Sequence, residues 1–400
     1  MSIQIRQIIV ATRTTLGSIK RRKAISVSMA LSVSLVVMVL TGFLAMADGF
    51  EKALSGTGSP LVAVILGGGT NRETGSDVPA DAIRSLKASA DNIGALRNVS
   101  GDLVASRELV VPVDVFGTGD KTSRTLALRG MDASGLSIRD GITLFEGRLF
   151  APGAREIVVG ASIVRDYPGF GIGAKVRLGA VDWTVVGHFA ANGSAFESEI
   201  WSDIDAVRAA FDRQGEVQSL RLRLIEQPSL ATLNAKLATM TGIPLTAVSE
   251  ATLYAAQAGR TSDLIRLFGW PIALLMAIGA TAGALNTMMS SISDRTVEIA
   301  TLRALGFSRL SAFLATWLEA SLLAAAGTGI GVLASRLVFD GWQASTIGAN
   351  DTSMAFQLTL SFDAMLTGGL LGLAIGLVGG ALPALAASRL PLIAALRARG

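Results

Sequence analysis

Residues Ala24–Ala47, AISVSMALSVSLVVMVLTGFLAMA, form a run of 24 residues without a charged side chain. A helix needs about 20 apolar residues to cross the roughly 30 Å hydrocarbon core of a bilayer. A helix of a soluble protein rarely runs that long without a charge, because one of its faces meets water. This stretch therefore predicts a helix that spans a membrane.

Three more stretches have the same character. Leu267–Ser293 and Ala364–Ser388 contain no charge, and Leu310–Ser335 contains only Glu319. An alternative interpretation of the first stretch is a cleaved signal peptide, because basic residues precede it and Ala45-Met46-Ala47 is similar to a signal-peptidase site. Its apolar run is longer than the usual signal core of about 7–15 residues, so we favour an uncleaved helix. The chain is thus expected to cross a membrane four times.

Basic residues concentrate in the segments that four crossings place on one side. Residues 1–23, 294–309 and 389–400 together carry 12 Lys and Arg and two acids, a net charge of +10. Lys and Arg concentrate on the cytoplasmic side of membranes. Both termini are therefore predicted to be cytoplasmic, and residues 48–266, with 22 basic and 25 acidic residues, to lie outside. Because the basic excess lies beside lipid headgroups, we expect membrane-lipid contacts and no nucleic-acid partner.

The outer segment mixes strand and helix patterns and predicts an α+β domain. The runs typical of strands are Leu61–Leu66, Leu103–Phe116, Arg124–Arg129, Glu156–Val159, Lys175–Leu178, Trp183–Phe189 and Ser219–Leu224. Helical patterns cover Asp48–Leu54, Pro79–Ser89, Asp203–Phe211 and Ser229–Met240. Gly179–Asp182 predicts a hairpin turn between two of the strands. From Ser249 the pattern stays helical into the second span, so the ends of the domain are expected to form a helical stalk.

No group of residues points to a catalytic or metal site. The chain has no cysteine and a single histidine, His188. This excludes a disulfide scaffold, a thiolate zinc site and a cysteine nucleophile, and a lone histidine is expected to be structural. No Walker A loop is present. We therefore expect neither an enzyme nor a directly bound cofactor.

Glu319 is the one ionisable residue well inside a predicted span. Carboxylates inside a membrane are costly and usually face protein or water. Two interpretations stay open. Glu319 makes a polar contact that transmits movement between helices, with Asn286 or Thr287 of the second span as its partner, or it makes a structural hydrogen bond near the inner interface.

The loop after the second span, DRTVEIATLRALGFS at Asp294–Ser308, predicts a short amphipathic helix closed by Gly306. This string closely resembles the coupling segment of ABC transporter permeases of the MacB/FtsX type, and Leu382–Arg397 resembles the ending of the same family. Segments that resemble the family's extracytoplasmic core are Leu128–Met131, Glu146–Arg148, Glu156–Gly160, Trp183–Gly187 and Gly193–Trp201.

The resemblance covers nearly the whole chain and implies a dimer of four-helix subunits in the bacterial inner membrane, with residues 48–266 in the periplasm. It also implies an ATPase docked under the coupling loop. Because the sequence has no nucleotide-binding domain, that ATPase is expected to be a separate chain, which uses the ATP. The residues carried over as ATPase contacts are Arg295, Glu298, Ile299, Leu302, Arg303, Leu305 and Gly306.

The resemblance implies an α-helical membrane protein with four transmembrane helices and a large α+β extracytoplasmic domain between helices 1 and 2. It implies a permease subunit that couples ATP hydrolysis to movement of that domain, for export or envelope remodelling, by mechanotransmission. The alternatives are an FtsX-like regulator of a periplasmic enzyme, and a membrane-anchored sensor or adhesion domain. Implied partners are a second permease chain, identical or different, and a periplasmic adaptor.

The predicted segments are 1–23 (amphipathic helix), 24–47, 267–293, 310–335 and 364–388 (spans), 48–266 (outer domain), 294–309 (coupling loop), 336–363 (short outer loop) and 389–400 (tail).

Overall fold

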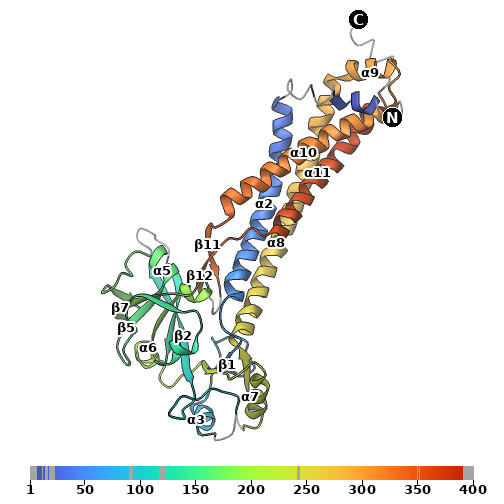
Figure 1. The fold of residues 1–400 in the computed structure, drawn as a ribbon. Helices are drawn as coiled ribbons and strands as arrows, with labels where there is room; N and C mark the ends of the chain where they lie inside the picture. Colours follow the sequence, from blue (N-terminus) through green and yellow to red (C-terminus); the bar gives the residue numbers. More distant parts are fainter. Residues whose placement is uncertain are drawn as a thin grey trace. The chain divides into compact units, whose positions relative to one another are not determined.

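A computed structural model describes residues 7–10, 12, 13, 17, 23–89, 93–116, 123–240, 244–348, 350 and 352–390. The chain divides into two compact units (Figure 1). The helical unit comprises Met1–Asp48, Asp263–Trp342 and Leu358–Gly400, and the sheet unit comprises Gly49–Ser262 and Gln343–Gln357. Most of the amphipathic helix predicted at 1–23 and most of the tail predicted at 389–400 lie outside the described residues.

Four helices in the described part of the chain are long and apolar enough to cross a membrane. They are α2 (Lys23–Ser55), α8 (Glu250–Asp294), α10 (Arg309–Phe339) and α11 (Phe362–Ser388) (Figure 1). The prediction of four apolar helices and a large mixed domain after the first of them is confirmed. The unbroken helix expected from Ser249 is also present, because the Ser249 hydroxyl accepts the Thr252 backbone N–H at 3.1 Å and α8 continues without a break.

Small residues allow α10 and α11 to pack closely. Gly368, Gly372, Gly376 and Gly380 recur every four residues on α11, which places them along one face of the helix. A Cβ atom added at Gly376 would lie 2.1 Å from the Cβ of Ala324 on α10. Without a strong hydrophobic drive between helices in lipid, such close backbone approach is a main source of packing energy.

The sheet unit contains a ten-stranded sheet among the described residues, in the order β10-β1-β9-β2-β3-β8-β5-β7-β4, with β6 paired to β7. Its strands are β1 (Val62–Gly67), β2 (Ala105–Phe116), β3 (Ser123–Met131), β4 (Thr143–Gly147), β5 (Glu156–Gly160), β6 (Lys175–Leu178), β7 (Val181–Ala190), β8 (Glu199–Asp203), β9 (Ser219–Arg223) and β10 (Leu245–Ser249). The β3–β8 and β5–β7 pairs are parallel, and the other pairs are antiparallel.

Short helices accompany the sheet: α3 (Ala80–Ala88), α4 (Gly135–Ile138), α5 (Ala161–Asp166), η1 (Ala195–Ser198), α6 (Ile204–Ala210) and α7 (Ser229–Ala238). One apolar core gathers around Leu128, Trp183 and Ile200, and a second gathers around Ile65 and Leu222. The predicted strands and helices of this unit are confirmed within a few residues. The predicted hairpin is β6–β7, although its turn is shorter than expected. The short strands β4, β8 and β10 have no counterpart among the predicted strands.

Residues 336–363, predicted as a short outer loop, contain a hairpin of β11 (Gln343–Ile347) and β12 (Ser353–Gln357). The hairpin belongs to the sheet unit. The Ala355 backbone N–H donates to the Ser198 hydroxyl at 3.0 Å, and Phe356 packs edge-to-face on Phe50 with ring centroids 5.5 Å apart. The strands of this hairpin, β11 and β12, are therefore part of the sheet unit.

Candidate functional site

The predicted coupling helix is present as α9 (Thr296–Ala304), between α8 and α10 in the chain. Gly306 follows it with φ +94°, a backbone conformation that favours glycine. The Gly306 N–H donates to the Arg303 carbonyl at 3.1 Å, and the Phe307 N–H donates to the Leu302 carbonyl at 3.2 Å. These two bonds satisfy the last carbonyls of the helix, as expected for a glycine-terminated C-terminus. The predicted helix and its glycine stop are confirmed.

Within the helical unit, the residues carried over as ATPase contacts differ in exposure. Leu305 is 73% exposed, and Glu298 and Gly306 are also exposed. Ile299 and Leu302 are half-buried. The exposed end of α9 is thus an apolar side chain beside a backbone turn, which is the kind of surface a groove in a partner protein can receive.

The two arginines of this set turn toward their own unit. The Arg303 guanidinium donates to the backbone carbonyls of Ser388 and Leu390, at 3.1 Å each. Arg295 is buried, and one of its Nη atoms lies 3.3 Å from Glu319 Oε2. Arg303 therefore ties α9 to the residues at the end of α11, and Arg295 ties it to α10.

The expected pairing of Glu319 with Asn286 or Thr287 is corrected by this ion pair. Asn286 is exposed on α8, and the Thr287 hydroxyl donates to the Gly283 carbonyl of its own helix at 2.6 Å. Glu319 pairs with Arg295 instead, because the long side chain of Arg295 reaches Glu319 from the start of α9. Arg295 Nε also lies 3.3 Å from Glu298, so one arginine serves two carboxylates.

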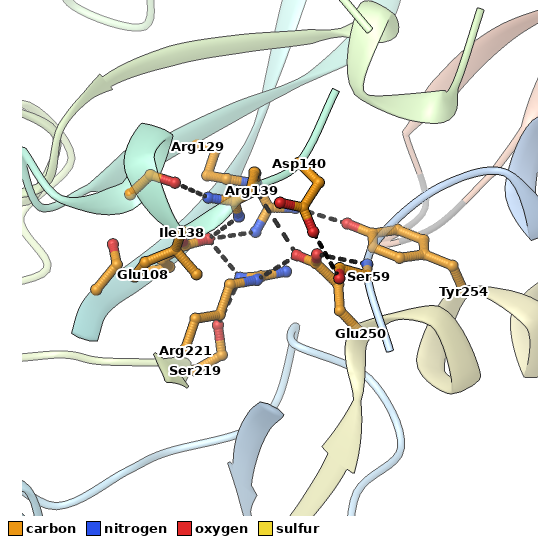
Figure 2. A network of polar contacts seen from close by, with 12 residues as sticks. Ser59, Glu108, Arg129, Ile138, Arg139, Asp140, Ser219, Arg221, Glu250 and Tyr254 are labelled. Atoms are coloured by element: carbon orange, nitrogen blue, oxygen red, sulfur yellow. Dashed lines mark hydrogen bonds and ion pairs between the residues drawn. The ribbon is translucent and has the colours of Figure 1, made fainter. Parts of the chain in front are cut away.

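The sheet unit holds a second group of functional interest, a buried cluster of charges (Figure 2). We call it the charge network and define it as Glu73, Glu108, Arg129, Arg139, Glu199, Arg221 and Glu250. All seven side chains are at most 9% exposed. Buried charges are costly unless they are paired and hydrogen-bonded, so this arrangement needs a specific geometry.

Four neighbouring strands supply alternating charges to the network. In the order β9-β2-β3-β8, the strands contribute Arg221, Glu108, Arg129 and Glu199. Opposite charges on adjacent strands attract each other directly. Positively and negatively charged side chains thus alternate across these four strands.

Arg129 is the most highly connected member and is fully buried. Its guanidinium donates to both oxygens of Glu199 at 2.7 Å each. It also donates to both oxygens of Glu73, at 2.8 and 3.0 Å, and to Glu108 at 3.0 Å. The planar fork of arginine suits such two-point contacts with carboxylates. A sixth contact, at 3.3 Å, reaches the hydroxyl of Tyr254 on α8.

Arg221 and Arg139 complete the network. Arg221 donates to Glu73 at 2.7 Å and to Glu250 at 2.8 Å, and it also contacts Glu108. Arg139 donates to Glu108 at 2.7 Å, and its guanidinium carbon lies 5.2 Å from the ring centre of Phe196, a cation–π distance. Every glutamate in the network therefore has at least one arginine partner.

The arginines of the network lower the pKa of two of its carboxyl groups, Glu73 and Glu108. Burial alone would raise the pKa of Glu73, but Coulombic attraction to Arg129 and Arg221 outweighs burial and holds that pKa well below its usual value. For Glu108, burial is likewise outweighed by Arg139, Arg221 and Arg129, and its pKa is lowered. A carboxyl whose pKa falls on folding stabilises the folded state only while it is ionised.

These lowered pKa values predict that the sheet unit is sensitive to acid. Glu73 and Glu108 contribute their full stabilisation above the unfolded-state pKa of about 4.3, and they lose it as pH falls below that value toward their lower folded-state pKa. We expect the melting temperature of the purified chain, followed by fluorescence of the buried Trp183 and Trp201, to fall steeply below about pH 5. Glu73→Gln should flatten this dependence. A melting temperature that stays constant down to about pH 3.5 would contradict it.

His188 has the structural role expected for a lone histidine. It is buried on β7, with Nδ1 2.9 Å from Glu146 and Nε2 2.7 Å from the Phe170 carbonyl oxygen. Both ring nitrogens therefore have partners inside the sheet unit. In the part of the chain that the structure describes, no three metal-ligating side chains come together.

Comparison with known families gives two adjoining matches. The profile of the MacB-like periplasmic core domain matches residues 26–240, and that of the FtsX-like permease C-terminal domain matches residues 271–392. Among curated proteins, the macrolide export ATP-binding/permease protein MacB of Acinetobacter baylyi is 22% identical over 375 residues, covering 85% of this chain and 55% of that protein. MacB of Bdellovibrio bacteriovorus is 24% identical over 422 residues, covering 96% and 60%. The chain thus spans little more than half the length of these relatives.

The chain also aligns with solved structures at low similarity. The periplasmic region of MacB from Actinobacillus actinomycetemcomitans aligns with a TM-score of 0.38 and 13% identity, covering 50% of this chain and 94% of that one. The extracellular domain of the ABC-type transporter YknZ aligns with a TM-score of 0.34 and 12% identity, covering 47% and 100%. The profile matches are the stronger finding, since the core-domain profile alone covers more than half of the chain. The chain therefore belongs to the MacB/FtsX-like permease family, in which a MacB-like periplasmic core domain is joined to an FtsX-like permease domain.

Proposed function

We propose that this chain is the membrane-spanning permease subunit of an ABC transporter, and that it couples ATP hydrolysis by a separate cytoplasmic ATPase to movement of the sheet unit in the periplasm. Family membership supports the permease role. The names of the MacB relatives combine ATP-binding and permease functions in one protein. We place the ATPase site on a separate chain as part of the proposal, because these 400 residues contain no Walker A loop.

The observation that carries the proposal is the exposed end of α9. Leu305 is 73% exposed and lies beside the Gly306 turn, between two helices that are apolar enough to cross a membrane. An exposed leucine is common on protein surfaces, but here it adjoins the half-buried Ile299 and Leu302 on a short helix. A groove on the ATPase would cover these side chains and remove them from water.

The distribution of charge supports a cytoplasmic position for α9. The three segments predicted to lie on its side carry a net charge of +10, and such segments concentrate in the cytoplasm. We propose the bacterial inner membrane as the location, with both termini inside. Arg295 and Arg303 are bonded within the helical unit. The other ten basic side chains of these segments would then lie near anionic lipid headgroups.

The proposal includes a second permease chain beside this one. Asn286 is exposed within the apolar helix α8, where hydrocarbon would offer its amide no hydrogen-bond partner. A second copy packed on this face of α8 would provide one, since polar side chains commonly bond across helices in membranes. A periplasmic adaptor that binds the sheet unit completes the proposed assembly.

Changing Leu305 to glutamine tests the ATPase contact. Glutamine and methionine have nearly the same shape, so Leu305→Met serves as the matched control that keeps the side chain apolar. Burial of such a side chain contributes about 1.5–3 kcal/mol, so Leu305→Gln is expected to weaken binding of the ATPase about 10- to 100-fold. The measurement is the dissociation constant between the purified permease and its proposed ATPase partner.

Membrane insertion and the melting temperature of both variants should equal those of the unchanged protein, because Leu305 is exposed in the isolated chain. Leu302→Asp, at the half-buried neighbour, is expected to abolish co-purification of the ATPase. If Leu305→Gln and Leu305→Met bind the ATPase equally well, the end of α9 is not the contact surface and the coupling proposal fails.

A further inference from the structure

Three segments that continue into the apolar helices meet at the charge network of the sheet unit. They are the first turn of α8, the residues that follow α2, and the tip of the β11–β12 hairpin, which joins α10 to α11. In each segment, the residues that contact the charge network belong to the sheet unit. The role assigned to this junction rests on the proposed coupling function.

Two side chains near the start of α8 make these contacts, one as a member of the network and one as its neighbour. Glu250 accepts from Arg221 at 2.8 Å, and Arg139 Nε lies 3.6 Å from the same Glu250 oxygen. One turn further on, the Tyr254 hydroxyl lies 3.3 Å from Arg129. Glu250 and Tyr254 are both buried. The start of α8 is therefore fixed to β9 and β3 by buried, charge-assisted contacts (Figure 2).

The residues after α2 reach the same place. The Ser59 backbone N–H donates to Glu250 at 3.3 Å, and the Ser59 hydroxyl donates to Asp140 at 2.8 Å. Just before it, the Thr57 hydroxyl accepts the Ala195 backbone N–H at 2.8 Å. The residues that follow α2 are thus bonded both to the start of α8 and to other parts of the sheet unit.

The hairpin tip makes the third connection through Asn350. Its amide nitrogen donates to Glu73 at 3.3 Å, and its side-chain oxygen accepts the Thr74 backbone N–H at 3.4 Å. Asn350 is buried and has φ +59°, a left-handed conformation that asparagine tolerates better than most residues. Glu73 in turn is bonded to both Arg129 and Arg221. One asparagine therefore links the α10–α11 connection to the centre of the network.

We propose that the charge network is a rigid joint, which fixes the ends of α2 and α8 and the β11–β12 hairpin to the central strands, with Asn350 positioning the hairpin on Glu73. Flexible connections normally have few buried contacts and solvent-exposed backbone bonds. This junction has the opposite character, since its charged side chains are buried and each of its three arginines contacts at least two carboxylates. Movement of the membrane helices would then displace the sheet unit as a whole, and bending would occur elsewhere.

Spin labels can test the rigidity directly, because the chain has no cysteine of its own and each introduced cysteine is a unique label site. Exposed positions are available on α2 (Lys52), α3 (Lys87) and the hairpin (Ile347). Distance distributions are measured for the Lys52–Lys87 and Ile347–Lys87 pairs by double electron–electron resonance. The sample is the full chain in lipid nanodiscs, alone and with its ATPase in the nucleotide-free and ATP–vanadate states.

A rigid joint predicts one narrow distribution for each pair, with the same mean in all three samples. Asn350→Asp should at least double the width for the Ile347–Lys87 pair, since aspartate cannot donate to Glu73 and places a like charge beside it. Gln357→Glu introduces the same charge at an exposed position of the same hairpin and should leave the width unchanged. Asn350→Gly, which keeps the turn conformation and removes the amide, should also broaden the distribution.

Two results would overturn the proposal. A mean distance that shifts between the nucleotide-free and ATP–vanadate states of the unchanged chain would make the junction a hinge. Equal widths for Asn350→Asp and Gln357→Glu would remove the positioning role of Asn350. The comparison of widths in the chain alone needs no ATPase, so failure of the ATPase to bind would refute the proposed function and still leave the joint tested.

Discussion

Replacing Arg129 by methionine is expected to lower the free energy of unfolding of the sheet unit by about 3–5 kcal/mol. Arg129 is fully buried and bonded to Glu73, Glu108 and Glu199. Methionine fills a similar volume but offers no charge, so these carboxylates would stay buried with fewer partners or would take up protons. Removing one partner of a buried ion pair leaves an unpaired buried charge. This costs far more than the intact pair contributes over apolar side chains in the same place.

The measurement is the melting temperature of the purified full chain, followed by tryptophan fluorescence. Trp201 donates to Glu199 at 2.8 Å and so reports on the network itself. A loss of this size corresponds to a decrease of roughly 6–20 °C for a domain of this length. Arg148→Met is the matched control, since Arg148 is exposed and pairs with Glu156 at the surface, where a pair is worth about 0–1 kcal/mol. Equal melting temperatures for the two variants would show that the network does not stabilise the fold.

Replacing Arg295 by methionine is expected to destabilise the helical unit by about 3–5 kcal/mol, and adding Glu319→Gln is expected to restore much of the loss. Arg295 and Glu319 have side chains only 10% and 6% exposed and lie 3.3 Å apart. Without the arginine, Glu319 would keep a buried charge on an apolar helix, which is unfavourable. Glutamine removes that charge and keeps a hydrogen-bonding side chain of the same length.

A double-mutant cycle of melting temperatures in detergent measures this coupling, with Glu298→Gln as the control at the exposed carboxylate that Arg295 also contacts. The double variant also separates two roles of Arg295. If it folds normally and binds the ATPase, Arg295 acts inside the permease. If Arg295→Met leaves the melting temperature unchanged but abolishes ATPase binding, Arg295 is an ATPase contact, as the family resemblance implies.

The apolar helices and α9 can be predicted because their signals are local. A charge-free run of 24 residues is decisive on its own, and the glycine that ends α9 acts within a single turn. The direction in which a side chain of α9 points is not local information. The family resemblance assigns Arg295 to the ATPase contact without this information. In the structure, the guanidinium of Arg295 points toward Glu319.

The charge network cannot be predicted because its members are far apart in the sequence and imitate surface residues. In β9, SLRLR, Arg221 alternates with leucines, a pattern that normally places the charged face of a strand in water. Here that face is covered, and Arg221 is fully buried. Its partners Glu73 and Glu250 lie 148 and 29 residues away. Only the tertiary fold reveals that these scattered charges meet.

The β11–β12 hairpin escapes sequence-based prediction for a different reason. Its strands contain glutamine, serine and threonine, and Asn350 and Asp351 separate them, so the segment is typical of a polar loop. The strands are stabilised by contacts with the sheet unit, such as the Ala355–Ser198 bond. Sequence patterns over such a short polar segment do not carry that information.

Thiol labelling in cells tests most directly whether α9 lies where an ATPase can bind it while the sheet unit lies outside. Single-cysteine variants Leu305→Cys and Lys87→Cys, both at exposed positions, are treated with a membrane-impermeant maleimide after the outer membrane alone is opened. The proposed topology predicts immediate labelling of Lys87→Cys, and labelling of Leu305→Cys only once the inner membrane is opened, with protection by co-expressed ATPase. Labelling of Leu305→Cys through an intact inner membrane, or no labelling of Lys87→Cys, would contradict it.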